Sequence, residues 1–254
     1  MKKILALLLA GMMTLSFAAC QQDAEKTKTP SEPPSESVSA EAAVYPQLAD
    51  KPAEDTEVAV IETEAGTIKM CFYPEYAPKA VENFLTHAKD GYYDGLTFHR
   101  IIQDFMIQGG DPEGNGSGGE SIWGKGFEVE LCENLRHFRG AVCMARAQAM
   151  DSQGSQFYIV DGIDVPDNLL DQMASMGAEN GWSEEVIEGY RELGGYPMLD
   201  FQYTVFGQVF EGMDVVDALI DNAKVEDSNG TVLAGNQPKI ISITVEPASN
   251  HFSY

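Results

Sequence analysis

Residues Phe98–Asp111 read FHRIIQDFMIQGGD, and this stretch decides the fold. It contains an apolar run that includes Ile101, Ile102, Phe105, Met106 and Ile107, which is typical of a buried strand. One permanently charged side chain, Arg100, lies inside the apolar run, and Gln108 follows it. Arginine is rarely buried unless it is paired or used in chemistry. The two glycines before Asp111 indicate a turn or a close backbone approach.

Residues 1–19 have the pattern of a signal peptide. Lys2 and Lys3 precede an apolar stretch, and small residues precede Cys20, which is typical of a secretory signal. Residues 16–20 (SFAAC) resemble the lipobox of bacterial lipoproteins. This resemblance implies cleavage before Cys20 and a lipid anchor, with palmitate among its acyl chains, that holds the protein in the cell membrane and outside the cytoplasm. An ordinary signal peptide that ends near a cysteine is the alternative.

Residues 20–57 are predicted to be a disordered tether that lifts a domain off the membrane. The segment is rich in Ser, Pro, Glu, Thr, Ala and Lys, and Tyr45 is its one aromatic residue. Such a composition cannot bury enough apolar surface to offset the entropy of ordering. Residues 58–247 are long enough for one domain with a full core, and residues 248–254 would form a C-terminal tail.

The charge of the chain excludes one class of partner. The chain has 40 acidic and 16 basic residues, and its formal net charge is −24. Nucleic acid needs a basic face, so we expect no nucleic-acid partner. Close binding to anionic lipid is also disfavoured, so the lipid anchor must hold the protein at the membrane.

Three cysteines, Cys71, Cys132 and Cys143, follow Cys20. They are isolated, without the CxxC spacing of a zinc site or a redox pair, so no metal site is predicted. Cys71 and Cys143 lie in apolar, strand-like runs, where buried free thiols are expected. One disulfide remains an alternative.

Many short strands and two widely separated helices predict a mainly β protein. Helices are expected between Pro78 and Gly91 and over 213–222, and the closed antiparallel barrel capped by two helices is the fold that this order favours. Residues 161–197 break the strand rhythm as a helical insertion, with helices over 165–176 and 183–193. Further strands are expected over 58–64, 67–73, 127–131, 140–147, 155–160, 203–209 and 240–245.

The segment Gly114–Gly119 (GNGSGG) formally matches the GxGxxG pattern of dinucleotide sites. No helical pattern follows it and no βαβ unit surrounds it, so a dinucleotide site is rejected. A surface loop is expected instead.

Three blocks in order resemble the cyclophilins, which are peptidyl-prolyl cis–trans isomerases (EC 5.2.1.8). They are FHRIIQDFMIQGGD at 98–111, GSQFYI at 154–159 and MLDFQYTVFGQVFEGMDVV at 198–216. The resemblance covers residues 58–247 apart from the insertion. It implies an eight-stranded cyclophilin-like barrel and isomerase activity, without a cofactor, on the X–Pro bonds of exported polypeptides.

The same resemblance assigns roles to individual residues. Arg100 would donate a hydrogen bond to the prolyl nitrogen of a twisted amide, and Phe105 and Gln108 complete the catalytic set. Plain core packing of Phe105 and Met106, a structural ion pair for Arg100 and a satisfied core histidine at His99 are the alternatives. The substrate groove is assigned to Met106, Ala145, Arg146, Gln156, Tyr158, Leu199 and Tyr203.

The sequence departs from the family at three groove positions. Arg146 replaces an asparagine, which is expected to change substrate preference while turnover survives. Met198 replaces a tryptophan that supports cyclosporin binding, so weak cyclosporin affinity is expected. Tyr203 replaces a histidine and still offers an aromatic wall. The insertion would gate the groove, recruit a client protein or be a surface decoration.

Two other functions compete with the enzyme. A non-catalytic chaperone or surface adhesin would hold proline-containing segments with little turnover, but the presence of Arg100 and Gln108 favours the isomerase. A solute-binding lipoprotein would share the signal and the tether, but the chain is short and lacks two α/β lobes. A monomer is expected.

Overall fold

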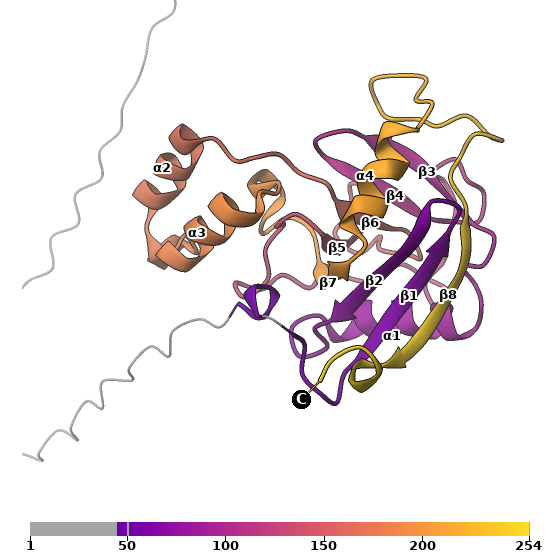
Figure 1. Ribbon diagram of the computed structural model, residues 1–254, viewed down its shortest axis with the longest axis horizontal. Helices are drawn as coiled ribbons and strands as arrows, with labels where there is room; N and C mark the ends of the chain where they lie inside the picture. Colours follow the sequence, from indigo (N-terminus) through magenta and orange to yellow (C-terminus); the bar gives the residue numbers. More distant parts are fainter. Residues whose placement is uncertain (1–44, 50, 254) are drawn as a thin grey trace, which may run out of the picture. The chain divides into compact units, whose positions relative to one another are not determined.

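Eight strands form one antiparallel sheet in the computed structural model, which describes residues 45–49 and 51–253. The order across the sheet is β3-β4-β6-β5-β7-β2-β1-β8. Its two edges meet at a bridge between Thr97 and Lys239, so the sheet curls into the predicted barrel (Figure 1). The strands are β1 (Glu57–Thr63), β2 (Gly66–Phe72), β3 (Thr97–Ile102), β4 (Met106–Asp111), β5 (Ala141–Met144), β6 (Phe157–Val160), β7 (Val205–Glu211) and β8 (Ile240–Pro247).

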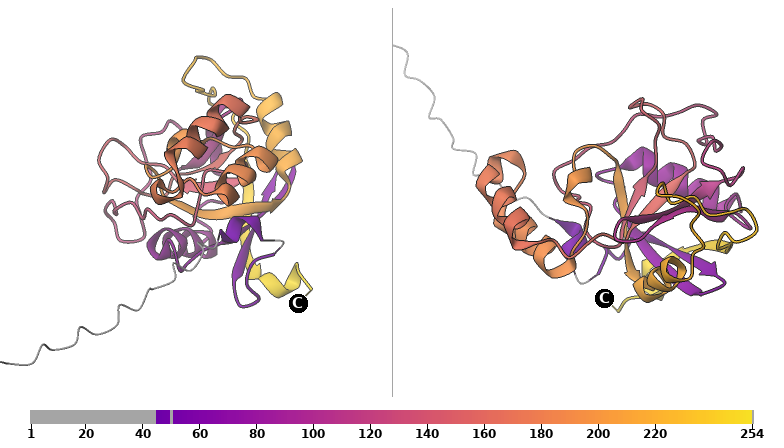
Figure 2. Two further views of the ribbon diagram at one scale, coloured as in Figure 1. Left: turned by 90° about the vertical axis from the view of Figure 1, so that its left-hand side faces the viewer. Right: turned by 90° about the horizontal axis from the view of Figure 1, so that it is seen from above.

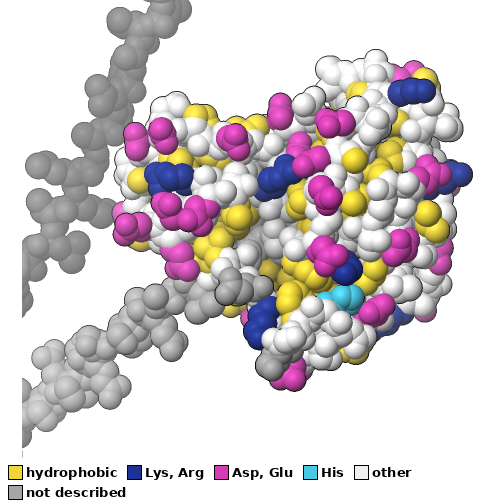
Figure 3. Space-filling view, in the orientation of Figure 1, with side chains coloured by type: hydrophobic (Ala, Val, Ile, Leu, Met, Phe, Trp, Pro, Cys, Tyr) yellow, Lys and Arg dark blue, Asp and Glu magenta, His cyan; other side chains and the backbone are white. Residues whose placement is uncertain are grey.

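Two helices pack on the barrel and two form the predicted insertion. α2 and α3 pair beside the barrel in Figure 1 and in the right-hand view of Figure 2, and acidic side chains gather on this pair (Figure 3). The Ser183 hydroxyl caps α3 by accepting a hydrogen bond from the Val186 N–H, which confirms the predicted helix start. The helices are α1 (Pro78–Lys89), α2 (Asp167–Met176), α3 (Glu184–Leu193) and α4 (Met213–Asp221).

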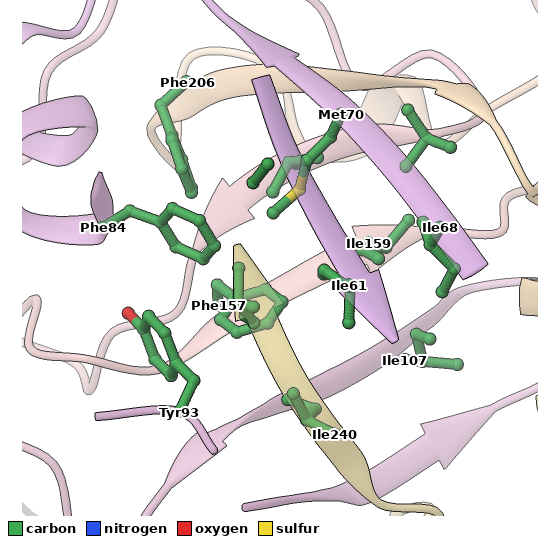
Figure 4. Close-up of a cluster of buried hydrophobic side chains, with 14 of the residues drawn as sticks. Ile61, Ile68, Met70, Phe84, Tyr93, Ile107, Phe157, Ile159, Phe206 and Ile240 are labelled. Carbon is green, nitrogen blue, oxygen red and sulfur yellow. The ribbon is translucent and has the colours of Figure 1, made fainter. Parts of the chain in front are cut away.

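Apolar side chains that alternate along the strands fill the barrel. Ile61 of β1 and Ile68 of β2 point inward, and Phe84 reaches in from α1 (Figure 4). The centroid of the Phe84 ring lies 5.1 Å from that of Tyr93 and 5.2 Å from that of Phe157. These large aromatic contacts hold α1 against the strands that carry the site described below.

The stretch that decides the fold is a hairpin rather than a single strand. β3 and β4 pair antiparallel, with residues 103–105 between them. Asp104 adopts a left-handed backbone conformation with φ of 61°, and its N–H donates to Asp161 Oδ2 at 2.8 Å. The polar turn residues Gln103 and Asp104 interrupt the apolar run only briefly, which is why the sequence alone indicates one strand.

Residues 127–131 do not form the expected strand. Phe127 makes an isolated bridge with Gln153 and belongs to no strand of the sheet. Glu130 instead turns toward α1, where its carboxylate accepts hydrogen bonds from the N–H groups of Lys79 and Ala80 at 3.0 and 2.9 Å. The first N–H groups of a helix have no partner within it, so Glu130 caps α1 instead of extending a strand.

The predicted tether ends earlier than residue 57. Tyr45 is 5% exposed and packs in one apolar cluster with Tyr190 of α3, and residues 46–48 form a 3-10 helix. The Gln47 side chain bonds both backbone groups of Arg136, at 2.9 and 2.6 Å. The insertion supplies an apolar surface that the local composition does not reveal. The predicted signal peptide, the predicted lipid anchor on Cys20 and the predicted tether up to residue 44 lie outside the described residues.

The three cysteines of the barrel are free thiols. Cys71 and Cys143 are buried, as predicted, and Cys132 is half-buried. No group of three His, Cys, Asp or Glu side chains in residues 45–49 and 51–253 is placed to hold a metal ion. Within the same ranges, no helix has the length and apolar character needed to cross a bilayer.

Candidate active site

Nine of the residues that the sequence assigns to the site line one cavity of about 100 Å³. The tenth, Gln156, lines an adjoining pocket of about 240 Å³ with Gln108, Ala145 and Arg146. Segments far apart in the sequence therefore meet at one place, whereas the role of each side chain in catalysis stays a prediction. The cavity is lined by Arg100, Phe105, Met106, Gln108, Ala145, Arg146, Tyr158, Leu199 and Tyr203.

Three neighbouring strands carry one side of the cavity. Arg100 of β3 lies opposite Gln108 of β4, which lies opposite Tyr158 of β6. Alternation along β4 turns Ile107 into the barrel core and places Met106 in a second apolar cluster behind the cavity. Met106 is 1% exposed, so it is both a packed residue and part of the cavity wall.

A bulge in β3 sets the direction of Arg100. The register with β4 shifts between Phe98 and Arg100, so His99 is an extra residue in the strand. Bulges bend a strand and re-aim its side chains. His99 is 4% exposed, and neither ring nitrogen has a hydrogen-bond partner among the described residues, which counts against the alternative of a core histidine satisfied by protein groups. Burial lowers the pKa of His99, which favours the neutral ring.

Hydrogen bonds hold the Arg100 guanidinium in one orientation. Its Nε donates to the carbonyl oxygen of Asn229 at 2.8 Å, and its Nη1 donates to Gln108 Oε1 at 3.2 Å. Gln108 Nε2 donates to Gln156 Oε1 at 2.8 Å, and Gln156 Nε2 donates to the Gly118 carbonyl oxygen at 2.8 Å. We name Arg100, Gln108 and Gln156 the glutamine relay. Burial lowers the pKa of Arg100, but arginine stays charged at physiological pH.

The glycine-rich loop at the end of the glutamine relay is held by Asp111. Its carboxylate accepts hydrogen bonds from the N–H groups of Glu113, Asn115 and Gly116 at 2.9, 3.1 and 2.6 Å. Burial raises the pKa of Asp111, but backbone hydrogen bonds outweigh burial and the net pKa lies below its ordinary value. The sequence predicts the loop but misses this support. An aspartate just before a glycine-rich turn is the signal that could have revealed it.

Arg146 belongs to the wall of the groove. Its guanidinium carbon lies 4.5 Å from the centre of the Tyr203 ring, which is a cation–π contact. It also donates to the carbonyl oxygens of Gln202 and Ala147, at 3.1 and 2.9 Å. These contacts hold the charge of Arg146 against the wall, where it shapes the groove beside the cavity.

Comparison with known proteins identifies the family of this site. The family model described as cyclophilin type peptidyl-prolyl cis-trans isomerase/CLD matches residues 58–245. The chain belongs to the cyclophilin family. Two relatives of this cyclophilin, from Staphylococcus epidermidis and Staphylococcus aureus, are named as peptidyl-prolyl cis-trans isomerases. They are 48% and 47% identical to it over 71% of this chain and 89% of their own chains.

Solved structures agree with this family. A cyclophilin type peptidyl-prolyl cis-trans isomerase from Cryptosporidium parvum, crystallised in the presence of the dipeptide Ala-Pro, superposes with a TM-score of 0.57 at 29% identity. The match covers 74% of this chain and 98% of the other. A second crystal structure of that cyclophilin gives a TM-score of 0.58 at 28% identity. The cyclophilin described here is therefore an enzyme of the peptidyl-prolyl isomerase class (EC 5.2.1.8).

Proposed function

We propose that this cyclophilin isomerises X–Pro bonds by using Arg100 to stabilise the twisted amide. Resonance gives the amide C–N bond partial double-bond character and a rotation barrier of ~18–20 kcal/mol. Rotation breaks this resonance and leaves a lone pair on the prolyl nitrogen. A donor aimed at that nitrogen stabilises the twisted state more than either planar state, and this difference accelerates the reaction.

The placement of Arg100 is the observation that carries the proposal. The side chain lines the cavity, and its hydrogen bonds to Asn229 and Gln108 fix the guanidinium plane before any substrate binds. Arginine suits this role because it is always charged, planar and rich in donors. A donor that is held in advance does not have to be reorganised in the transition state.

The apolar part of the cavity is proposed to hold the proline ring. Phe105, Met106, Tyr158 and Leu199 supply apolar surface within reach of Arg100, whose guanidinium carbon lies 6.0 Å from the centre of the Phe105 ring. Such a pocket fixes the proline ring while the residue before it rotates. The Cryptosporidium parvum relative crystallised with Ala-Pro supports a proline peptide as the ligand.

The clients are proposed to be exported polypeptides. This part rests on residues 1–20, whose pattern implies export and a lipid anchor on Cys20 in the cell membrane, facing outside the cytoplasm. We also propose that the protein is a monomer with weak cyclosporin affinity. Mass spectrometry of the membrane fraction tests the anchor: an acylated N-terminal Cys20 is expected, and an unmodified chain that begins elsewhere would contradict it.

Protease-coupled isomerisation of an X–Pro tetrapeptide tests the mechanism. In Arg100→Ala, kcat is expected to fall by about 10²–10³-fold, as for other lost transition-state donors. Arg191→Ala, which changes an exposed arginine of α3, is the matched control and should keep the parent rate. Undiminished turnover in Arg100→Ala would refute the role of Arg100. Proline peptides bound without turnover by the unmodified protein would favour the chaperone or adhesin instead.

A further inference from the structure

Both ends of the insertion lie against the proposed proline pocket. At its start, the N–H groups of Asp161 and Gly162 donate to the carbonyl oxygen of Phe105 at 3.0 and 3.1 Å. Asp161 Oδ2 also accepts the N–H of Asp104, in the turn that precedes Phe105. At its end, the Tyr196 ring lies 4.6 Å from the Phe105 ring, centroid to centroid. The insertion therefore contacts the backbone and the ring of one pocket residue.

Backbone hydrogen bonds tie the two ends of the insertion together. Ile163 and Gly195 exchange a pair of them, at 3.0 and 2.9 Å, and the Arg139 N–H donates to the Gly194 carbonyl oxygen at 3.1 Å. Arg139 also forms an ion pair with Asp161. The two ends of the insertion therefore lie side by side and are bonded to the barrel beside Phe105. A surface decoration on a flexible linker would lack such bonds.

A buried set of polar side chains links α3 of the insertion to Tyr158 in the wall of the pocket. The Tyr190 hydroxyl donates to Asp200 Oδ2 at 2.8 Å, and Asp200 Oδ1 accepts from the His137 N–H at 2.9 Å and from His137 Nδ1 at 2.8 Å. His137 Nε2 lies 3.1 Å from the Tyr158 hydroxyl. We name Tyr190, Asp200, His137 and Tyr158 the Asp200 network. It ends on Tyr158 of the cavity, and Asp200 directly follows Leu199 of the cavity.

Because the Asp200 network is buried, the loss of the Tyr190 hydroxyl leaves its acceptor without a hydrogen-bond partner. Tyr190 is 0%, His137 1%, Tyr158 5% and Asp200 6% exposed, so water does not replace a lost partner freely. Without the Tyr190 hydroxyl, Asp200 Oδ2 keeps Arg136 Nε at 3.6 Å, which is beyond hydrogen-bond distance. A buried carboxylate oxygen without a donor is costly, so Asp200 would move toward another donor and take Leu199 and His137 with it.

We propose that the insertion positions the proline pocket through Tyr190, which acts on Leu199 and Tyr158 by way of Asp200 and His137. Tyr190 is a positioning residue, since it does not line the cavity. This inference rests on the proposed function, in which that cavity binds the proline ring. The pocket wall contacts the ring in the planar and in the twisted state, so a displaced wall weakens both and raises KM, whereas kcat depends on Arg100.

The test compares Tyr190→Phe with Tyr45→Phe in the full-length protein. Tyr45 is the matched control: it is buried in the same cluster, but its hydroxyl pairs with Ser183 and not with the Asp200 network. Each variant loses one hydroxyl and keeps its ring. We expect KM for an X–Pro tetrapeptide to rise about 3- to 10-fold in Tyr190→Phe, as for one lost buried hydrogen bond, with kcat near the parent value. In Tyr45→Phe, both constants should stay at the parent values.

The other outcomes overturn the inference in distinguishable ways. An unchanged KM in Tyr190→Phe would show that the Tyr190 hydroxyl does not position the pocket. An equal rise of KM in both variants would show that any loosening of the insertion raises KM, without a specific role for the Asp200 network. If Tyr190→Phe does not fold, Asp200→Asn is measured instead, and its KM must rise in the same range. Failure of both to fold would make the network a folding determinant only. Turnover that is absent from the unmodified protein, or unaffected by Arg100→Ala, refutes the proposed function instead.

Discussion

Arg100 and Gln108 face each other across the β3–β4 hairpin, and Arg100 Nη1 donates a hydrogen bond to Gln108 Oε1 at 3.2 Å. Because arginine offers only donors, this contact fixes the Gln108 amide with its oxygen toward Arg100. Gln108 Nε2 then faces Gln156, whose Oε1 accepts its hydrogen bond at 2.8 Å. The orientation of the guanidinium thus depends on both glutamines of the relay.

The glutamine relay predicts that a residue beyond Gln108 affects turnover. Gln156→Leu removes the acceptor of Gln108 Nε2, so the amide can rotate away from Arg100. We expect kcat/KM to fall by about 3- to 10-fold, the effect of one hydrogen bond, in the protease-coupled assay. Gln172→Leu on the exposed surface of α2 is the control and should leave kcat/KM unchanged.

A double-mutant cycle tests whether Gln108 and Gln156 act through one another or each contact the substrate independently. If Gln108 and Gln156 act through one another, the double variant Gln108→Leu/Gln156→Leu loses little more than Gln108→Leu alone. Losses that simply add would show that each glutamine contacts the substrate on its own, and the relay would be abandoned.

Met198 predicts weak cyclosporin binding. It is 64% exposed beside Leu199 of the cavity, and a methionine offers less rigid contact area than the tryptophan it replaces in the family. Met198→Trp is expected to tighten binding about tenfold or more, as a central tryptophan does at interfaces, measured by calorimetric titration. Leu233→Trp adds the same ring at another exposed position and should have no effect. A nanomolar complex with the unmodified protein contradicts the prediction.

Asp111 predicts an acid-dependent loss of stability. Its pKa is lower in the folded than in the unfolded protein, so its contribution is present above about pH 4, the pKa of an unfolded aspartate, and is lost as pH falls through the folded pKa. We expect Asp111→Asn to lower the free energy of unfolding by about 1–2 kcal/mol at pH 7. Urea unfolding should show this difference shrinking below pH 4.

His87 does not confound the Asp111 comparison, whereas His99 contributes to it. Burial lowers the pKa of both histidines, so their protonation destabilises the fold below about pH 6.5. The Asp111 charge raises the pKa of His99 against burial, so Asp111→Asn lowers that pKa further, and the His87 contribution cancels in the difference while the His99 contribution does not. A stability gap between the two proteins that stays constant from pH 7 to pH 3 would show that the Asp111 charge is not what holds the loop.

Arg136 predicts a large structural effect away from the reacting atoms. Its side chain is fully buried, donates to the Gly181 carbonyl oxygen at 2.8 Å and lies 3.6 Å from Asp200 Oδ2. Arg136→Met leaves Asp200 as a buried charge with fewer positive neighbours, so we expect about 3 kcal/mol of lost stability in urea. Arg191→Met removes an exposed partner of Glu188 and should cost less than about 0.5 kcal/mol. Equal effects of the two would contradict a stabilising role for the buried arginine.

The resemblance to the cyclophilins made much of the site predictable. Three ordered sequence blocks were enough to assign Arg100, Gln108 and Tyr158 to one site, whereas only the structure shows that they lie opposite one another on β3, β4 and β6. The order of residues 45–48 was missed, since it depends on α3, which lies far along the chain. Whether the His99 ring has a hydrogen-bond partner could not be predicted, because it is a property of packing.

The sequence by itself determined the barrel and its helices, because periodicity is local, and its resemblance to the cyclophilins identified the residues around the cavity. Only the tertiary structure decided that both ends of the insertion contact Phe105 of the cavity. The partners Tyr190, Asp200 and His137 stand on three separate segments, and no spacing in the sequence indicates that their polar atoms meet. A buried hydrogen bond needs both partners at one distance and angle, and the packing of distant segments alone provides that geometry.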